Sequence, residues 1–125
     1  MPSSTAPSFR ILLVEDHFTT RTALSIWLTD LGHDVVAVES ISAAIAAAAN
    51  RPFDVLLSDI GLPDGDGRSL VQRLQQTHRF RAIAISGLSI GPSEREASRQ
   101  AGFEAHLEKP FNPIDLERCL QPLAS

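Results

Sequence analysis

The stretch that decides the fold runs from Val55 to Gly67 and reads Val-Leu-Leu-Ser-Asp-Ile-Gly-Leu-Pro-Asp-Gly-Asp-Gly. Its first residues, Val55 to Ser58, form a short and nearly continuous apolar run, which is typical of a parallel strand buried on both faces. The glycines and Pro63 that follow Asp59 cannot continue a strand and predict turns. Asp59 therefore stands at the end of a strand, where its carboxylate is directed out of the sheet.

Four other apolar runs predict four more strands, near Arg10 to Val14, Asp34 to Val38, Ala82 to Ser86 and Ala105 to Leu107. Polar groups stand at the ends of three of them: the acids Glu15 and Asp16, the hydroxyl of Ser86, and the ammonium of Lys109. In an open parallel sheet, ligands bind outside the carboxyl ends of the strands. We therefore expect these groups to meet Asp59 in one site suited to phosphoryl transfer.

Amphipathic helices are predicted between the strands, because apolar residues recur there at intervals of three and four. The clearest sets are Leu24, Trp27, Leu28 and Leu31; Ile41, Ala44, Ile45 and Ala48; and Leu116, Cys119, Leu120 and Leu123. Further helices are predicted over Arg68 to Thr77 and over Ser93 to Ala101, with Gly102 as the cap of the latter. The alternation predicts an α/β three-layer sandwich, in which five helices cover both faces of a five-stranded parallel sheet.

Size and composition indicate one domain, since the chain has 125 residues, of which 43% are apolar and 21% charged. The net charge of -4 and the scattered cations argue against direct binding of nucleic acid, and no segment is suited to membrane insertion. A single cysteine, Cys119, excludes an internal disulfide and favours a cytoplasmic location. Residues 1–8 are predicted to be a flexible N-terminal tail and residues 9–125 the domain, with output through partners or a larger protein.

Three carboxylates in one pocket repel one another unless a proton or a cation compensates them. Mg²⁺ suits Glu15, Asp16 and Asp59, because it prefers oxygen ligands and takes few carboxylates. The four histidines and the cysteine do not cluster in the sequence, which argues against zinc, and His17 is expected at the start of the first helix. With the acids compensated, Asp59 can attack phosphorus as a nucleophile, while Ser86 and Lys109 contact the phosphoryl oxygens.

The motifs together resemble the receiver domain of bacterial response regulators. The resemblance rests on Glu15-Asp16, on Asp59 with Ile-Gly-Leu-Pro-Asp-Gly-Asp-Gly after it, on Ser86-Gly87 and on Lys109-Pro110, and it spans roughly Phe9 to Leu123. It implies the flavodoxin-like strand order 2-1-3-4-5. It also implies that Asp59 is the phosphoacceptor, that Glu15, Asp16, Asp59 and the Gly61 carbonyl hold Mg²⁺, that Ser86 is the switch hydroxyl, and that Lys109 contacts the phosphoryl group.

The same resemblance implies a partner and a role. A sensor histidine kinase or a histidine phosphotransfer protein would donate the phosphoryl group, and the chain would be a signalling switch rather than a turnover enzyme. One position departs from the family pattern, because His106 stands where the family usually has Tyr or Phe. His106 is either a pH-sensitive switch residue, since free imidazole titrates near pH ~6.5, or a surface histidine on an edge strand.

Other interpretations stay open. The polar fourth helix is either a weakly held element that can be switched or an ordinary solvated helix. A receiver-like docking or dimerisation module without phosphorylation is a second function, against which the five intact site residues argue. A phosphatase of the haloacid dehalogenase type is a third, but it needs a second Asp where this chain has Gly61. Asp64 and Asp66 are expected to form turns rather than a calcium loop.

Overall fold

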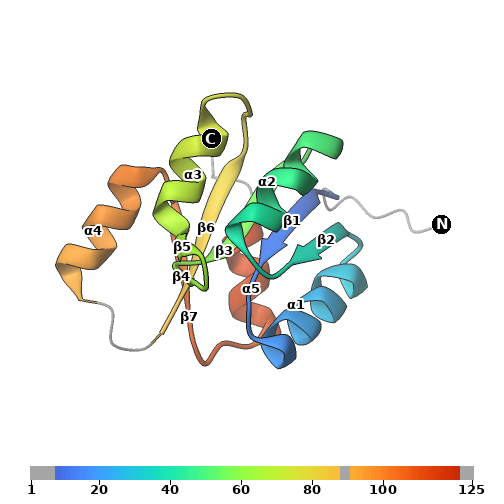
Figure 1. Ribbon diagram of the computed structural model, residues 1–125. Helices are drawn as coiled ribbons and strands as arrows, with labels where there is room; N and C mark the ends of the chain where they lie inside the picture. Colours follow the sequence, from blue (N-terminus) through green and yellow to red (C-terminus); the bar gives the residue numbers. More distant parts are fainter. Residues whose placement is uncertain (1–7, 88–90, 122–125) are drawn as a thin grey trace.

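Strands and helices alternate along the chain in the computed structural model, which describes residues 8–87 and 91–121 (Figure 1). Within this part, five strands form one parallel sheet in the order β2-β1-β3-β6-β7. They are β1 (Arg10–Val14), β2 (Asp34–Val38), β3 (Val55–Asp59), β6 (Arg81–Ser86) and β7 (Ala105–Glu108). Counted among these five strands alone, the order is 2-1-3-4-5, so the flavodoxin-like topology that the resemblance implied is confirmed.

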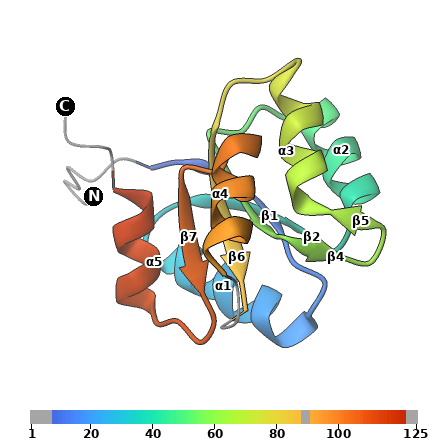
Figure 2. The ribbon, with the colours of Figure 1, turned by 90° about the vertical axis from the view of Figure 1, so that its left-hand side faces the viewer.

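The helices are α1 (Phe18–Asp30), α2 (Ile41–Asn50), α3 (Gly67–Gln75), α4 (Pro92–Ala101) and α5 (Pro113–Leu120). Helices α1 and α5 cover one face of the sheet and α2 and α3 the other, while α4 lies beside α3 near the β7 edge (Figures 1 and 2). The predicted helices and the three-layer sandwich are thereby confirmed. Leu123, which the periodicity assigned to the last helix, lies outside the described residues. Among those residues, no helix combines the length and apolar character that a bilayer crossing requires.

The core explains why the strands are apolar without alternation. Neighbouring residues of β1 point to opposite faces: Leu13 packs on the α1 and α5 side, whereas Leu12 packs on the α2 and α3 side. Both are at most 2% exposed. Burying one such leucine stabilises the fold by about 1.5–3 kcal/mol, so both faces of the strand have to be apolar.

Helix caps set where the helices begin and end. The side chain of His17 caps α1 by accepting from the amide of Thr20, so its expected place at the start of this helix is confirmed. Asp66 caps α3, and Asn112 caps α5 by accepting from the amide of Asp115 over 2.9 Å. At the end of α4, Gly102 has φ 128°, a conformation that favours glycine.

Two local features differ from the sequence predictions. After Asp59 the chain forms a small antiparallel hairpin of β4 (Gly61–Leu62) and β5 (Gly65–Asp66), where we expected turns alone. Leu31 was placed on the inner stripe of the first helix, but α1 ends at Asp30 and Leu31 is 37% exposed. The predicted tail lies outside the described residues except for Ser8, whose hydroxyl donates to the carbonyl of Gly32 over 2.7 Å.

Candidate functional site

Three carboxylates meet at the carboxyl ends of two neighbouring strands. Glu15 and Asp16 follow β1, and Asp59 is the last residue of β3, which pairs with β1 up to Val14 opposite Ser58. One oxygen from each carboxylate lies within 4.8 Å of the others. The structure therefore brings the acids together as the strand ends predict.

Glu15 is the buried member of this acidic cluster. Its side chain is 0% exposed, and Oε2 accepts a hydrogen bond from the amide of His17 over 2.9 Å. Burial raises the pKa of Glu15, and the charge of Asp59 adds to the effect, although the His17 amide and Lys109 oppose it. Because burial is the main cause, the ionised form of Glu15 is costly to hold here unless a cation lies close by.

Lys109 supplies that cation from the segment after β7. Its Nζ lies 3.2 Å from Asp59 Oδ2 and 3.2 Å from Glu15 Oε1. Burial favours the neutral amine, but the charges of Asp59 and Glu15 outweigh burial and raise the pKa of Lys109. The ammonium form is therefore held between two of the three acids.

Ser86 contributes a buried hydroxyl from the end of β6. The residue is 5% exposed, and its Oγ has no hydrogen-bond partner within the described part of the chain. It lines a pocket of about 200 Å³ together with Asp59, Ile60, Gly61, Arg68, Gly87 and Glu94. An unsatisfied buried hydroxyl is uncommon in proteins, and this one belongs to a residue that lines the same pocket as Asp59.

The hairpin holds Gly61 against Asp59. The amide of Gly61 donates to Asp59 Oδ1 over 3.2 Å, and the amide of Gly67 donates to the carbonyl of Ile60 over 2.6 Å. A Cβ at Gly67 would overlap the backbone carbonyl of Asp59. The chain can therefore fold back this closely behind the strand end only with glycine at position 67.

His106 lies apart from the acidic cluster. It sits on β7, the edge strand, which Figure 2 shows between α4 and α5, and its side chain is half-buried. Its Nε2 is buried without a hydrogen-bond partner among the described residues. Burial lowers the pKa of His106, Arg95 and Arg68 lower it further, and Glu108 partly offsets them. Its role as a switch stays a prediction.

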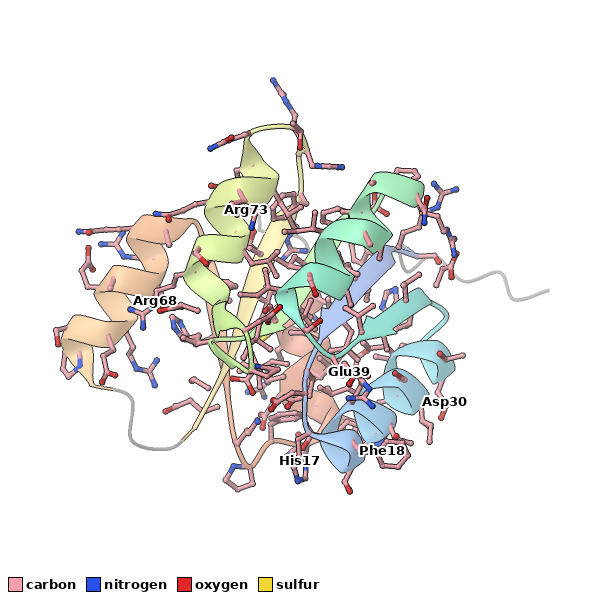
Figure 3. All side chains as sticks on the ribbon, in the orientation of Figure 1. His17, Phe18, Asp30, Glu39, Arg68 and Arg73 are labelled. Atoms are coloured by element: carbon pink, nitrogen blue, oxygen red, sulfur yellow. The ribbon has the colours of Figure 1, made fainter. Side chains whose placement is uncertain are left out.

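Arg68 is a pocket residue that the sequence did not single out. It belongs to the first turn of α3, and its side chain lies toward α4 (Figure 3). Its Nε donates to Asp66 Oδ1 over 3.2 Å, which ties the guanidinium to the residue that caps the same helix. The sequence placed Arg68 at the start of a predicted helix, but no pattern indicated that its side chain lines the pocket.

The donor set fits Mg²⁺. Carboxylate oxygens from three residues converge there, and opposite ligands of one Mg²⁺ lie about 4 Å apart, close to the span of the cluster. Burial and, after it, the charge of Asp59 raise the pKa of Glu15, and a divalent cation would offset the second of these effects. Neither His17 nor His106 belongs to the cluster, which argues against a zinc site there.

The fold and the pocket define a doubly wound α/β domain with an acidic site at its strand ends. A family model described as the response regulator receiver domain matches residues 11–121. The chain therefore belongs to the response regulator receiver domain family. This membership sets aside the alternative of a haloacid dehalogenase phosphatase.

Relatives carry this domain in different proteins. The chain is 33% identical over 111 residues to the KDP operon transcriptional regulatory protein KdpE of Escherichia coli, covering 89% of this chain and 49% of KdpE. It is 30% identical over 124 residues to the sensor histidine kinase GacS of Pseudomonas protegens, covering 94% of this chain and 13% of GacS. The chain thus spans half or less of these two proteins.

A solved structure agrees over nearly the whole chain. The chemotaxis protein CheY4 of Vibrio cholerae, crystallised at low pH, superposes with a TM-score of 0.84 at 29% sequence identity. The match covers 92% of this chain and 98% of that protein. The similarity therefore extends over the whole sheet and its covering helices.

Proposed function

We propose that this chain is the phosphoacceptor domain of a two-component phosphorelay. In this role Asp59 takes a phosphoryl group from a phosphohistidine, and the modification changes the affinity of the domain for its partners. The observation that carries the proposal is the position of Lys109 Nζ, 3.2 Å from Asp59 Oδ2 and 3.2 Å from Glu15 Oε1. An ammonium held at the nucleophile can stabilise the charge of the phosphoryl oxygens during transfer.

The proposed transfer is a single displacement at phosphorus. A carboxylate oxygen of Asp59 forms the new P–O bond while the P–N bond to the donor histidine breaks. The electron pair of that bond stays on the departing imidazole nitrogen, which takes up a proton from solvent. The product is an acyl phosphate on Asp59.

The surrounding residues would position the phosphoryl group. Lys109 would pair with one phosphoryl oxygen, and the unpartnered hydroxyl of Ser86 would donate a hydrogen bond to another. Glu15, Asp16, Asp59 and the Gly61 carbonyl would hold Mg²⁺. When bound, the ion would supply positive charge that offsets the acids and the phosphoryl oxygens. The domain assists its own modification and does not turn over a separate substrate.

A histidine kinase or a histidine phosphotransfer protein is the proposed phosphodonor. The relatives support this choice, because GacS is named a sensor histidine kinase and matches 94% of this chain. The sensory/regulatory protein RpfC of Xanthomonas campestris also matches 94% of the chain, at 27% identity. The phosphohistidine can therefore belong either to a separate partner or to the same polypeptide.

Intact mass measurement after incubation with Mg²⁺ and acetyl phosphate tests the proposal. We expect wild type to gain one phosphoryl group and Asp59→Asn to gain none. Asp54→Asn is the matched control, because Asp54 is an exposed acid at the opposite ends of the strands and its loss should leave labelling intact. An unlabelled wild type, under conditions that label another receiver, would favour a docking or dimerisation module instead.

A further inference from the structure

The β4–β5 hairpin is fixed at both its base and its tip. At the base, the amide of Gly61 donates to Asp59 Oδ1 over 3.2 Å. At the tip, Asp64 accepts two hydrogen bonds from the start of α2: Oδ1 from the amide of Ile41 over 2.9 Å, and Oδ2 from the amide of Ser42 over 3.0 Å. The hairpin therefore bridges the acidic site and a helix that begins 18 residues before Asp59 in the sequence.

Asp64 completes the capping of α2. The first amides of a helix have no partner within it and need acceptors from outside. Ser40 Oγ accepts from the amide of Ala43 over 3.1 Å, so Ser40 serves only the third amide of the helix. The first two amides are served by Asp64, which belongs to another element. The first three amides of α2 therefore all have acceptors only while the hairpin tip is docked on the helix.

Charge and packing strengthen this contact. The hydrogen bonds from Ile41 and Ser42 hold the pKa of Asp64 below its usual value, so the group stays ionised near neutral pH. A carboxylate at this position also faces the positive end of the helix dipole. Gly65 has φ 148°, and a Cβ there would lie 3.0 Å from Ile41 Cδ1, so the hairpin tip packs closely on the first residue of α2.

We propose that Asp64 is a positioning residue that couples the acidic site to the start of α2. The inference rests on the proposed function, because it treats the Gly61 carbonyl as a Mg²⁺ ligand. The hairpin consists of two residue pairs, Gly61 with Asp66 and Leu62 with Gly65, so an anchored tip restricts the position of Gly61 directly. A ligand that fixes Gly61 then favours the docked tip, and the docked tip favours the ligand by the same free energy.

Mg²⁺ affinity measured by amide NMR titration tests the coupling. We expect Asp64→Ala to weaken Mg²⁺ binding about threefold to tenfold. Loss of a group that orients a metal ligand directly usually weakens binding by about tenfold or more, and Asp64 acts only through the hairpin. Asp64→Asn, which keeps one carbonyl acceptor, should fall between this variant and wild type. Ser40→Ala is the matched control, because it removes a cap from the same end of α2 without touching the hairpin, and its affinity should equal that of wild type.

Hydrogen exchange gives a readout that does not depend on phosphorylation. In wild type, Mg²⁺ should slow exchange of the Ile41 and Ser42 amides, and in Asp64→Ala this protection should be lost while the Ala43 amide is affected far less. Unchanged Mg²⁺ affinity in both Asp64 variants would overturn the inference. Equal weakening in Ser40→Ala would also overturn it, since helix stability alone would then explain the effect. A wild type that shows no Mg²⁺-dependent shift would instead contradict the proposed function itself.

Discussion

The backbone N–H of Lys109 donates to the carbonyl of Ser86 over 2.8 Å, so β6 and the segment that follows β7 stay joined at the end of their ladder. The Ser86 hydroxyl and the Lys109 ammonium therefore reach the site around Asp59 from one rigid pair of strand ends. Glu15 and Asp59 reach it from the neighbouring pair, β1 and β3. Because backbone bonds hold each pair, a side-chain substitution at the site can be interpreted without assuming that the strands move.

Lys109→Met should slow labelling of Asp59 by acetyl phosphate by about 10²-fold. Removing one preorganised electrostatic group from a reaction centre commonly has an effect of this size. Methionine keeps the length of the side chain but loses the charge that contacts Asp59 and Glu15. Rates come from intact mass spectra taken over time, and a labelling rate equal to that of wild type would refute the assigned role.

The pKa of Lys109 should fall when Asp59 is replaced by Asn. The charge of Asp59 is the largest effect that raises this pKa against burial. Lys109 is the only lysine in the chain, so reductive methylation with ¹³C-formaldehyde labels a single ε-amine. NMR titration of that signal gives the pKa in both proteins. An identical value in wild type and Asp59→Asn would show that the two groups do not interact in solution.

Glu15→Gln should raise the melting temperature at neutral pH when Mg²⁺ is absent. The pKa of Glu15 is raised in the folded protein, mainly by burial, so the folded state binds its proton more tightly than the unfolded state. The stabilising contribution of Glu15 is present below pH 4.5, which is its ordinary pKa, and it is lost as pH rises through the raised pKa of the folded protein. The advantage of the variant should therefore disappear near pH 4.5. Calorimetry across this range checks the sign, and a lower melting temperature for Glu15→Gln at pH 7 would contradict it.

His106→Phe should make the fold less sensitive to acid. Burial, Arg95 and Arg68 lower the pKa of His106 against the opposing effect of Glu108, so the folded protein takes up this proton less readily than the unfolded chain. Wild type therefore loses stability as pH falls below 6.5, the ordinary pKa of histidine, and through the lower pKa that His106 has in the folded protein. The melting temperature of the variant, relative to wild type, should rise as pH falls from 7 to 5. The pKa of His33 is also lowered by burial, but His33 is present in both proteins, so its effect cancels. A difference in melting temperature that stays constant from pH 7 to 5 would show that protonation of His106 is not coupled to stability.

Gly67→Ala should destabilise the fold by about 1–3 kcal/mol or more, because a Cβ there meets the backbone carbonyl of Asp59 rather than a movable side chain. Gly61→Ala is the matched control, since a Cβ at Gly61 has no atom within 4 Å among the described residues. Urea unfolding of both variants measures the difference. Equal stabilities would show that the loop after Asp59 adjusts more freely than the structure indicates.

The sequence was sufficient for the sheet and for the meeting of Glu15, Asp16, Asp59 and Lys109. The apolar runs of the strands and the periodicity of the helices are local patterns, so the sequence shows them directly. The four residues follow strand ends, and strand ends adjoin in a parallel sheet. The order of the strands came from the family resemblance and not from the spacing of residues. Apolar periodicity was a poorer guide at Leu31, because α1 ends one residue before it.

The sequence did not predict the hairpin or its contacts. Strands of two residues carry no periodicity, so the segment after Asp59 predicted only turns. The bond from Ile41 to Asp64 joins residues 23 apart and depends on how two elements dock. The helix that carries Arg68 was predicted, but the place of its side chain at the pocket depends on how α3 packs beside β3 and α4. Features of this kind arise from tertiary packing, which local patterns do not encode.

The order of strands in the sheet has a consequence for newly made protein. Lys109 follows the last strand to be synthesised, and this strand docks at the outer edge of the sheet beside β6. Until then, Glu15 and Asp59 would face each other without the ammonium that neutralises them. The proposed phosphorylation would therefore be slow until β7 has docked, so an unfinished chain on the ribosome would be a poor phosphoacceptor.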